Sequence, residues 1–128
     1  MNEYNILTLA FMGDSVYDLY VRHHVIRSLK AKPNTLQREA TIYVSAKSQS
    51  KTAQYLIDSN FLNEDELDIF KRGKNAKIHS KAKNASVMDY RMSTGFEAVL
   101  GSLYMSHQIE RLEQIVIHSI EYVEQEVK

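Results

Sequence analysis

The chain has 128 residues, of which 44% are hydrophobic and 25% are charged. These proportions are typical of globular proteins and exclude a disordered chain, and the length suits one domain with its own core. The 16 basic and 16 acidic residues cancel. A protein that binds nucleic acid through a strongly basic total charge is therefore excluded, and such binding would need cations clustered at one place.

Cysteine content and apolar runs indicate where the protein works. The chain has no cysteine, which excludes disulfides and thiolate metal sites and fits a reducing compartment. The first residues, MNEYNILTLAF, contain an acid and no basic residue ahead of the apolar ones, and no apolar run approaches the ~18 residues of a membrane span. We therefore expect a cytoplasmic protein with no membrane partner.

Hydrophobic residues recur every three or four positions along almost the whole chain, which predicts an all-α fold. Only one proline and four glycines interrupt this pattern. Helices are expected over residues 6–29, 34–44, 46–57, 63–73, 86–105 and 109–127. The segment 73–85 lacks clear periodicity and is expected to be an exposed loop.

Several helix ends carry recognisable capping residues. Pairs with the spacing of a capping box occur at Asn34 and Gln37, Asn63 and Glu66, and Ser86 and Asp89. Ser45 is expected to start the third helix. Gly73 is expected to end the fourth helix as its C′ residue, because glycine adopts the left-handed conformation that this position favours.

The first predicted helix contains an unusual pair, Gly13 and Asp14. Its apolar stripe consists of Leu9, Met12, Val16 and Leu19. Gly13 costs a helix about 1 kcal/mol relative to alanine unless another backbone or a ligand comes close. Asp14 is expensive to bury unless it meets a cation, a metal or several donors. The pair is therefore a candidate site.

The sequence MGDSVYDLYVR around this pair resembles the signature helix of the ribonuclease III family. RMSTGFEAVLGSLY, residues 91–104, resembles the second acidic helix of that family, with Glu97 in the matching position. KRGKNAK, residues 71–77, resembles the short branch called Mini-ribonuclease III. Three blocks in the right order are more specific than one motif. The resemblance implies a ribonuclease III-like helical domain over residues 1–128, working as a homodimer.

The resemblance also implies an activity, an endoribonuclease that cleaves double-stranded RNA. Hydrolysis of a phosphodiester in this way calls for a divalent metal ion held by carboxylates. Asp14 and Glu97 are the expected catalytic residues and the expected ligands of Mg²⁺. The short branch matures ribosomal RNA, so a ribosomal RNA precursor is the expected substrate, with a ribosomal protein as a candidate partner that presents it.

Two positions depart from the long form of the family. That form has a glutamate where this chain has Ala10 and an aspartate where it has Thr94, and the short branch shares both replacements. Fewer carboxylates leave more coordination positions to water, which Mg²⁺ tolerates, so the number of metal ions stays open. Asp18 lies near Asp14, but we expect it to pair with Arg22 four residues later.

Cations cluster in the segment 71–83, which has six basic residues and no acid. Duplex RNA is recognised mainly by shape and backbone, so this segment is expected to bind its phosphates. The expected RNA-binding residues are Arg72, Lys74, Asn75, Lys77, Lys81 and Lys83. A solvated flexible loop is the simpler alternative. A weaker expectation is a phosphate contact at residues 45–49, where a helix starts.

Two further functions remain open at this point. Ala10 and Thr94 are compatible with a non-catalytic module that binds double-stranded RNA on the same scaffold. A helical protein-interaction domain is the third hypothesis, although it leaves the basic segment and the glycine–aspartate pair unexplained. Gly13 also offers a reason for dimerisation, since it would let a symmetry-related helix approach closely.

Overall fold

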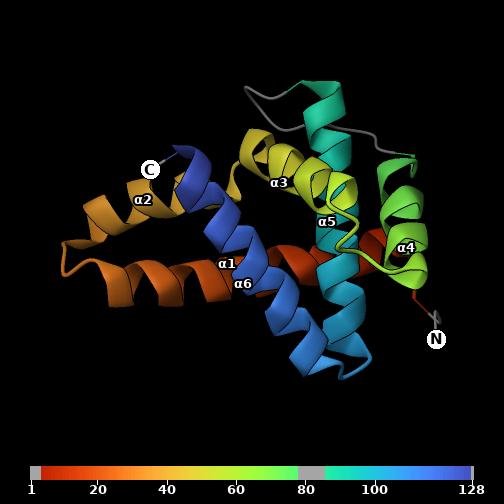
Figure 1. Ribbon diagram of the computed structural model, residues 1–128, viewed down its shortest axis with the longest axis horizontal. Coiled ribbons are helices and arrows are strands. Elements are labelled where there is room, and N and C mark those ends of the chain that lie inside the picture. The colour runs from red at the N-terminus through yellow and green to blue at the C-terminus, as the bar shows by residue number, and fades with distance from the viewer. Residues whose placement is uncertain (1–3, 78–85, 128) are drawn as a thin grey trace.

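The computed structural model describes residues 4–77 and 86–127, and the regular structure in them consists of six α-helices (Figure 1). The helices are α1 (Ile6–Ser28), α2 (Pro33–Val44), α3 (Ala46–Asp58), α4 (Glu64–Lys74), α5 (Val87–Met105) and α6 (Ile109–Val127). The all-α fold is confirmed, as hydrophobic periodicity predicted. Within the described part of the chain, no helix is both long and apolar enough to cross a membrane.

Three of the expected helix starts are confirmed by their caps. The side chain of Ser45 accepts a hydrogen bond from the backbone of the first turn of α3. Asn63 and Glu66 form a full capping box at the start of α4. Ser86 caps α5 in the same way as Ser45 caps α3. These caps satisfy backbone N–H groups that have no partner inside the helix.

Two of the predicted capping residues, Asn34 and Gly73, are wrong. α2 begins one residue before Asn34, because Pro33 takes the first helical position, where its fixed φ is suitable and its missing N–H is not needed. Gly73 is not a C′ residue, since α4 continues to Lys74 and Asn75 is its C-cap. Gly73 has no positive φ, and its missing side chain serves helix packing instead.

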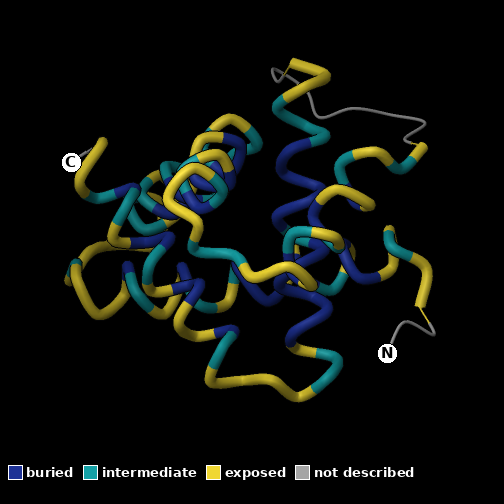
Figure 2. The backbone as a smooth tube through the Cα atoms, turned by 45° about the vertical axis from the view of Figure 1, so that its right-hand side comes forward, coloured by how far each residue is buried: buried dark blue, intermediate teal, exposed yellow. Residues whose placement is uncertain are grey.

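Helix α5 is the central element of the fold and contacts α1, α3, α4 and α6. Figure 2 shows the middle of this helix as buried, while exposed residues gather on the outer faces of its neighbours. Every residue from 92 to 103 is buried except Glu97, which is partly exposed. A helix surrounded in this way is expected to be apolar on all sides. Glu97 is thus the one charged residue in this stretch.

Two glycines bring the backbones of α1 and α5 into contact. A Cβ atom on Gly13 would lie 1.7 Å from the carbonyl oxygen of Glu97, and one on Gly101 would lie 1.8 Å from that of Leu9. No side chain fits at either position. Gly13 is therefore occupied by α5 of the same chain, which corrects the expectation that it serves a symmetry-related helix.

The buried face of α1 differs from the predicted stripe. It follows steps of four residues through Leu9, Gly13, Tyr17, Val21 and Val25. Leu19, which was expected on the apolar stripe, is 68% exposed, and Met12 is only partly buried. The glycine contact with α5 sets the rotation of α1 about its axis, and this rotation turns Leu19 outward.

We expect Gly13→Ala to destabilise the protein by at least about 2 kcal/mol, because the new methyl group would overlap the Glu97 carbonyl and separate α1 from α5. Urea unfolding followed by circular dichroism measures this change. Ser15→Ala is the control, because Ser15 is exposed on the same helix and alanine is the better helix former. A Gly13→Ala protein as stable as the wild type would contradict the close contact.

Candidate active site

Asp14 and Glu97 meet where α1 crosses α5. Gly13 packs against the backbone of Glu97, so the residue that follows it on α1 comes next to the Glu97 side chain. The two carboxyl groups are close enough to share a hydrogen bond. Asp14 is exposed and Glu97 is partly buried. The pair therefore opens to solvent at the edge of the buried helix, and Asp14 is not buried as the sequence analysis assumed.

The surroundings of Glu97 disfavour its negative charge. Burial, and to a smaller extent the nearby charge of Asp14, raise the pKa of the Glu97 carboxyl group from its usual value to about 8. A hydrogen bond from Gln49 opposes this rise and lowers the pKa. A second negative charge next to Asp14 is unfavourable without a cation between the two groups. A divalent cation between the two carboxyl groups would remove this unfavourable interaction, so the pair has the chemistry of a candidate metal site.

Gln49, in the first turn of α3, is the third polar side chain at this site. It is 1% exposed, and its Nε2 donates to the carbonyl oxygen of Val44 over 3.0 Å. Gln49 was expected to contribute to a phosphate contact at the surface, and this expectation is wrong because α3 buries it. The sequence contains a signal for this position. Gln49 lies four and seven residues before Ala53 and Leu56, which places it on the buried face of α3.

The donor atoms at this site suit Mg²⁺ better than Zn²⁺. Among the described residues, no three His, Cys, Asp or Glu side chains are grouped as a metal cluster. Ala10 is buried, and the hydroxyl of Thr94 donates to the carbonyl oxygen of Tyr90, so neither position adds a ligand. Mg²⁺ binds through one or two carboxylates and retains several waters. Zn²⁺ takes three or four protein ligands in most sites.

The expectation for Asp18 is confirmed. Its Oδ2 accepts from Nε of Arg22 over 2.9 Å, one helical turn further along α1. This pair lies on the surface and belongs to an ordinary i, i+4 contact. Asp18 is therefore paired with Arg22 and is not assigned to the candidate site.

The basic segment begins on a helix, as expected for Arg72. Lys74 also lies in the last turn of α4, so the expected loop start at residue 73 is wrong. Asn75 caps the helix and Lys77 is exposed beyond it. The expected RNA contacts at Lys81 and Lys83 lie outside the described residues.

Helix α4 holds these cations near the carboxylates. A Cβ atom on Gly73 would lie 3.0 Å from the side chain of Ala98, next to Glu97 on α5. Arg72 and Lys74 flank Gly73 in the sequence. The end of α4 is thereby fixed against the same stretch of α5 that carries Glu97.

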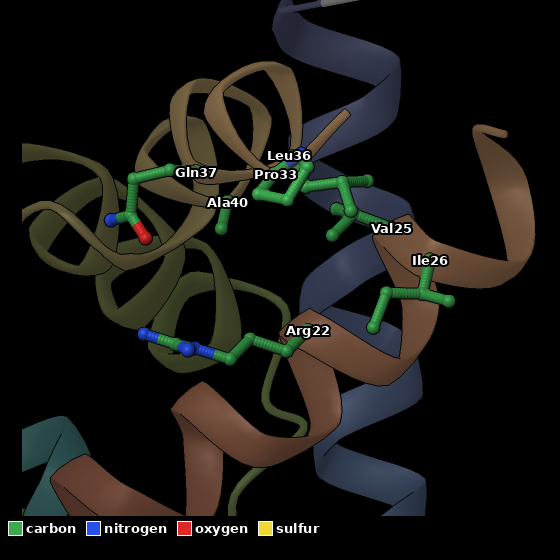
Figure 3. Close-up of a pocket in the computed structure, with 7 residues that line it drawn as sticks. All are labelled: Arg22, Val25, Ile26, Pro33, Leu36, Gln37 and Ala40. Carbon is green, nitrogen blue, oxygen red and sulfur yellow. The ribbon is translucent and has the colours of Figure 1, made fainter. Parts of the chain in front are cut away.

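A separate pocket lies between the end of α1 and the start of α2 (Figure 3). It has a volume of about 190 Å³, and its lining is mainly apolar, with Val25, Leu36 and Ala40 among the lining residues. Arg22 reaches toward it from α1 and Gln37 from α2. This pocket contains neither Asp14 nor Glu97 and is not part of the candidate site.

Comparison with known proteins agrees with this fold. The Ribonuclease III domain family matches residues 7–108. An X-ray crystal structure of a protein from Fusobacterium nucleatum superposes with a TM-score of 0.83 at 31% identity, covering 94% of each chain. The fold and the family match define a ribonuclease III domain.

Curated relatives place the chain more closely. The Mini-ribonuclease 3 of Streptococcus pneumoniae is 50% identical over 124 residues, which cover 97% of each chain. The Mini-ribonuclease 3 of Staphylococcus aureus is 51% identical over 112 residues, covering 88% of this chain and 84% of that one. The chain belongs to the Mini-ribonuclease III branch of the ribonuclease III family and is an endoribonuclease. This membership decides against the protein-interaction domain and the non-catalytic module.

The raised pKa of Glu97 predicts a pH dependence of stability in a metal chelator. The folded protein retains the Glu97 proton up to about pH 8, while the unfolded chain loses it near pH 4.5. This contribution to stability is therefore fully present below pH 4.5 and is lost as the pH rises through 8. We expect a loss of roughly 2–4 kcal/mol, discounted for the partial exposure of Glu97.

Thermal unfolding of the wild type and of Glu97→Gln between pH 4 and 9 measures this loss. The variant cannot lose the proton, so its stability should exceed that of the wild type by a margin that grows with pH. Parallel stability curves for the two proteins would contradict the raised pKa.

Proposed function

We propose that Asp14 and Glu97 are the catalytic residues of a metal-dependent endoribonuclease that cleaves double-stranded RNA. The observation that carries this proposal is the meeting of the two carboxyl groups at the α1–α5 crossing. Glu97 is the single charged residue in an otherwise buried stretch of α5, at a position where its charge is unfavourable. Functional sites are where such unfavourable placements are retained.

Asp14 and Glu97 would hold Mg²⁺ through their oxygen atoms. The bound ion would supply a Lewis acid that lowers the pKa of water and neutralises charge on the phosphate. Glu97 is fixed by the close packing of α5, while Asp14 is exposed and accessible to a phosphate that approaches from solvent. Glu97 would therefore give the site a fixed geometry, and Asp14 would leave one side of the site open to the substrate.

The basic segment is the proposed contact for the RNA backbone. Arg72, Lys74, Asn75 and Lys77 lead away from the end of α4, near the α5 stretch that carries Glu97, and we include Lys81 and Lys83 from the sequence. Positive residues at this place would neutralise phosphates next to the cleavage site. The contact would select a duplex by its shape and backbone and not by its base sequence.

The proposal includes a homodimer, in which each subunit would cut one strand. Exposed apolar residues on α1 support it, since Phe11 is 78% exposed and Leu7 lies one turn before it, on the same side. Membership of the Mini-ribonuclease III branch supports a precursor of ribosomal RNA as the substrate. We further propose that the enzyme works in the cytoplasm and that a ribosomal protein presents this RNA.

Removal of either carboxylate should abolish cleavage. We expect Asp14→Asn and Glu97→Gln each to slow cleavage of a labelled RNA duplex by about 100-fold or more in Mg²⁺, because each loses a charged ligand. The wild type should lose activity in chelator and regain it with Mg²⁺. Asp18→Asn is the matched control, a carboxylate on α1 that pairs with Arg22, and it should retain activity. Metal-dependent cleavage by Glu97→Gln at the wild-type rate would refute the proposed site.

The basic segment can be tested by charge reversal. The double variant Lys74→Glu and Lys77→Glu should bind an RNA duplex more weakly and lower the salt dependence of binding by about two phosphate contacts. The control is Lys30→Glu with Lys32→Glu, two exposed lysines at the turn between α1 and α2, which lies at the opposite end of the molecule from α4 (Figure 1). Equal affinities of the two double variants would remove the end of α4 from the RNA contact.

A further inference from the structure

The buried amide of Gln49 lies next to Glu97, and the proposed chemistry above assigns no role to it. Gln49 belongs to α3, packs toward α5 and is 1% exposed. Its side chain hydrogen-bonds to the Glu97 carboxyl group and to the backbone of Val44. A buried amide at this place costs free energy unless its polar atoms are satisfied, so its position calls for an explanation.

The partners of the amide determine which way it faces. Both the carbonyl oxygen of Val44 and the Glu97 carboxylate are acceptors, so the Nε2 group must face them. The other polar atom of the amide, Oε1, is buried and has no hydrogen-bond partner among the residues that the structure describes. A buried acceptor without a partner lowers the stability of the folded protein more than a missing contact at the surface does. Buried polar groups of this kind commonly bind water.

The Gln49 amide is anchored by Val44, which lies at the end of α2 and not on α1 or α5. Val44 is the last residue of α2, where helix carbonyls lack partners inside the helix, and Ser45 caps α3 immediately afterwards. The hydrogen bond to Val44 thus fixes the Gln49 side chain to the corner between two helices. A fixed donor restricts the orientations that the Glu97 carboxylate can adopt.

We propose that Gln49 is a positioning residue of the nuclease, whose anchored amide holds the Glu97 carboxylate toward Asp14. The inference rests on the proposed function of Asp14 and Glu97. The orientation of Glu97 matters at this site because Ala10 and Thr94 add no ligand to it.

The test compares Gln49→Met with Thr52→Val. Methionine keeps the length of glutamine and removes both polar ends. Thr52 is a matched control, since it lies three residues away on the same buried face of α3, is 0% exposed, and has an Oγ1 that also lacks a partner. Binding of Mn²⁺ to the RNA-free protein is measured by calorimetry, and cleavage kinetics are measured with an RNA duplex.

We expect Gln49→Met to weaken Mn²⁺ binding about 10-fold or more and to lower kcat by a similar factor, with little change in KM. Thr52→Val should match the wild type within about twofold. Wild-type Mn²⁺ binding and kcat in Gln49→Met would overturn the proposal. An equal loss in both variants would overturn it as well, because the loss would then come from packing.

A second measurement keeps Gln49 in place, so it tests the proposal even if the Gln49→Met protein does not fold. The side-chain NH₂ signals of Gln49 in nitrogen-15 NMR should shift on addition of Mg²⁺ and in Glu97→Ala. Unchanged signals in both experiments would overturn the proposal. Full activity in Glu97→Ala would instead refute the proposed site itself, whereas an inactive Glu97→Ala with a normal Gln49→Met would refute only the role of Gln49.

Discussion

The fold depends on the direct contact between the backbones of α1 and α5. Gly13 of α1 packs against the carbonyl group of Glu97, and Gly101 of α5 packs against the carbonyl group of Leu9. The crossing is therefore fixed at two points, which lie one turn apart on each helix. Gly95 and Gly73 bring α5 and α4 together in a similar way, which means that all four glycines of the chain lie at contacts of α5. Helices that approach so closely have little freedom to slide or rotate. The position of Glu97 relative to Asp14 follows from this restriction.

Function and stability conflict at the same crossing. Close packing desolvates Glu97, and the neighbouring Asp14 adds a charge of the same sign. An apolar residue at position 97 would be the more stable choice in a stretch that is otherwise buried. The free energy that the domain gains from packing α5 on four other helices offsets this local cost. Such local costs are common where a site must be ready for a charged ligand.

Local patterns predicted the helices well, because periodicity and caps such as Ser45 and Asn63 depend on nearby residues alone. Features set by tertiary packing were not predictable in this way. Leu19 was assigned to the buried face because two neighbouring stripes on α1 both fit a helical period, and only the contact with α5 decides between them. Asp14 was singled out with Gly13 from the pattern of the first helix, whereas Glu97 was identified through the family resemblance. Gln49 was missed because a glutamine near a helix start is usually at the surface.

The packing of Gly73 against α5 has a geometric consequence for the substrate. Because Gly73 packs against the stretch of α5 that carries Glu97, the cationic end of α4 and the Glu97 carboxylate belong to one closely packed pair of helices, which limits relative movement of their backbones. A duplex bound at both places would therefore be held in a constant register.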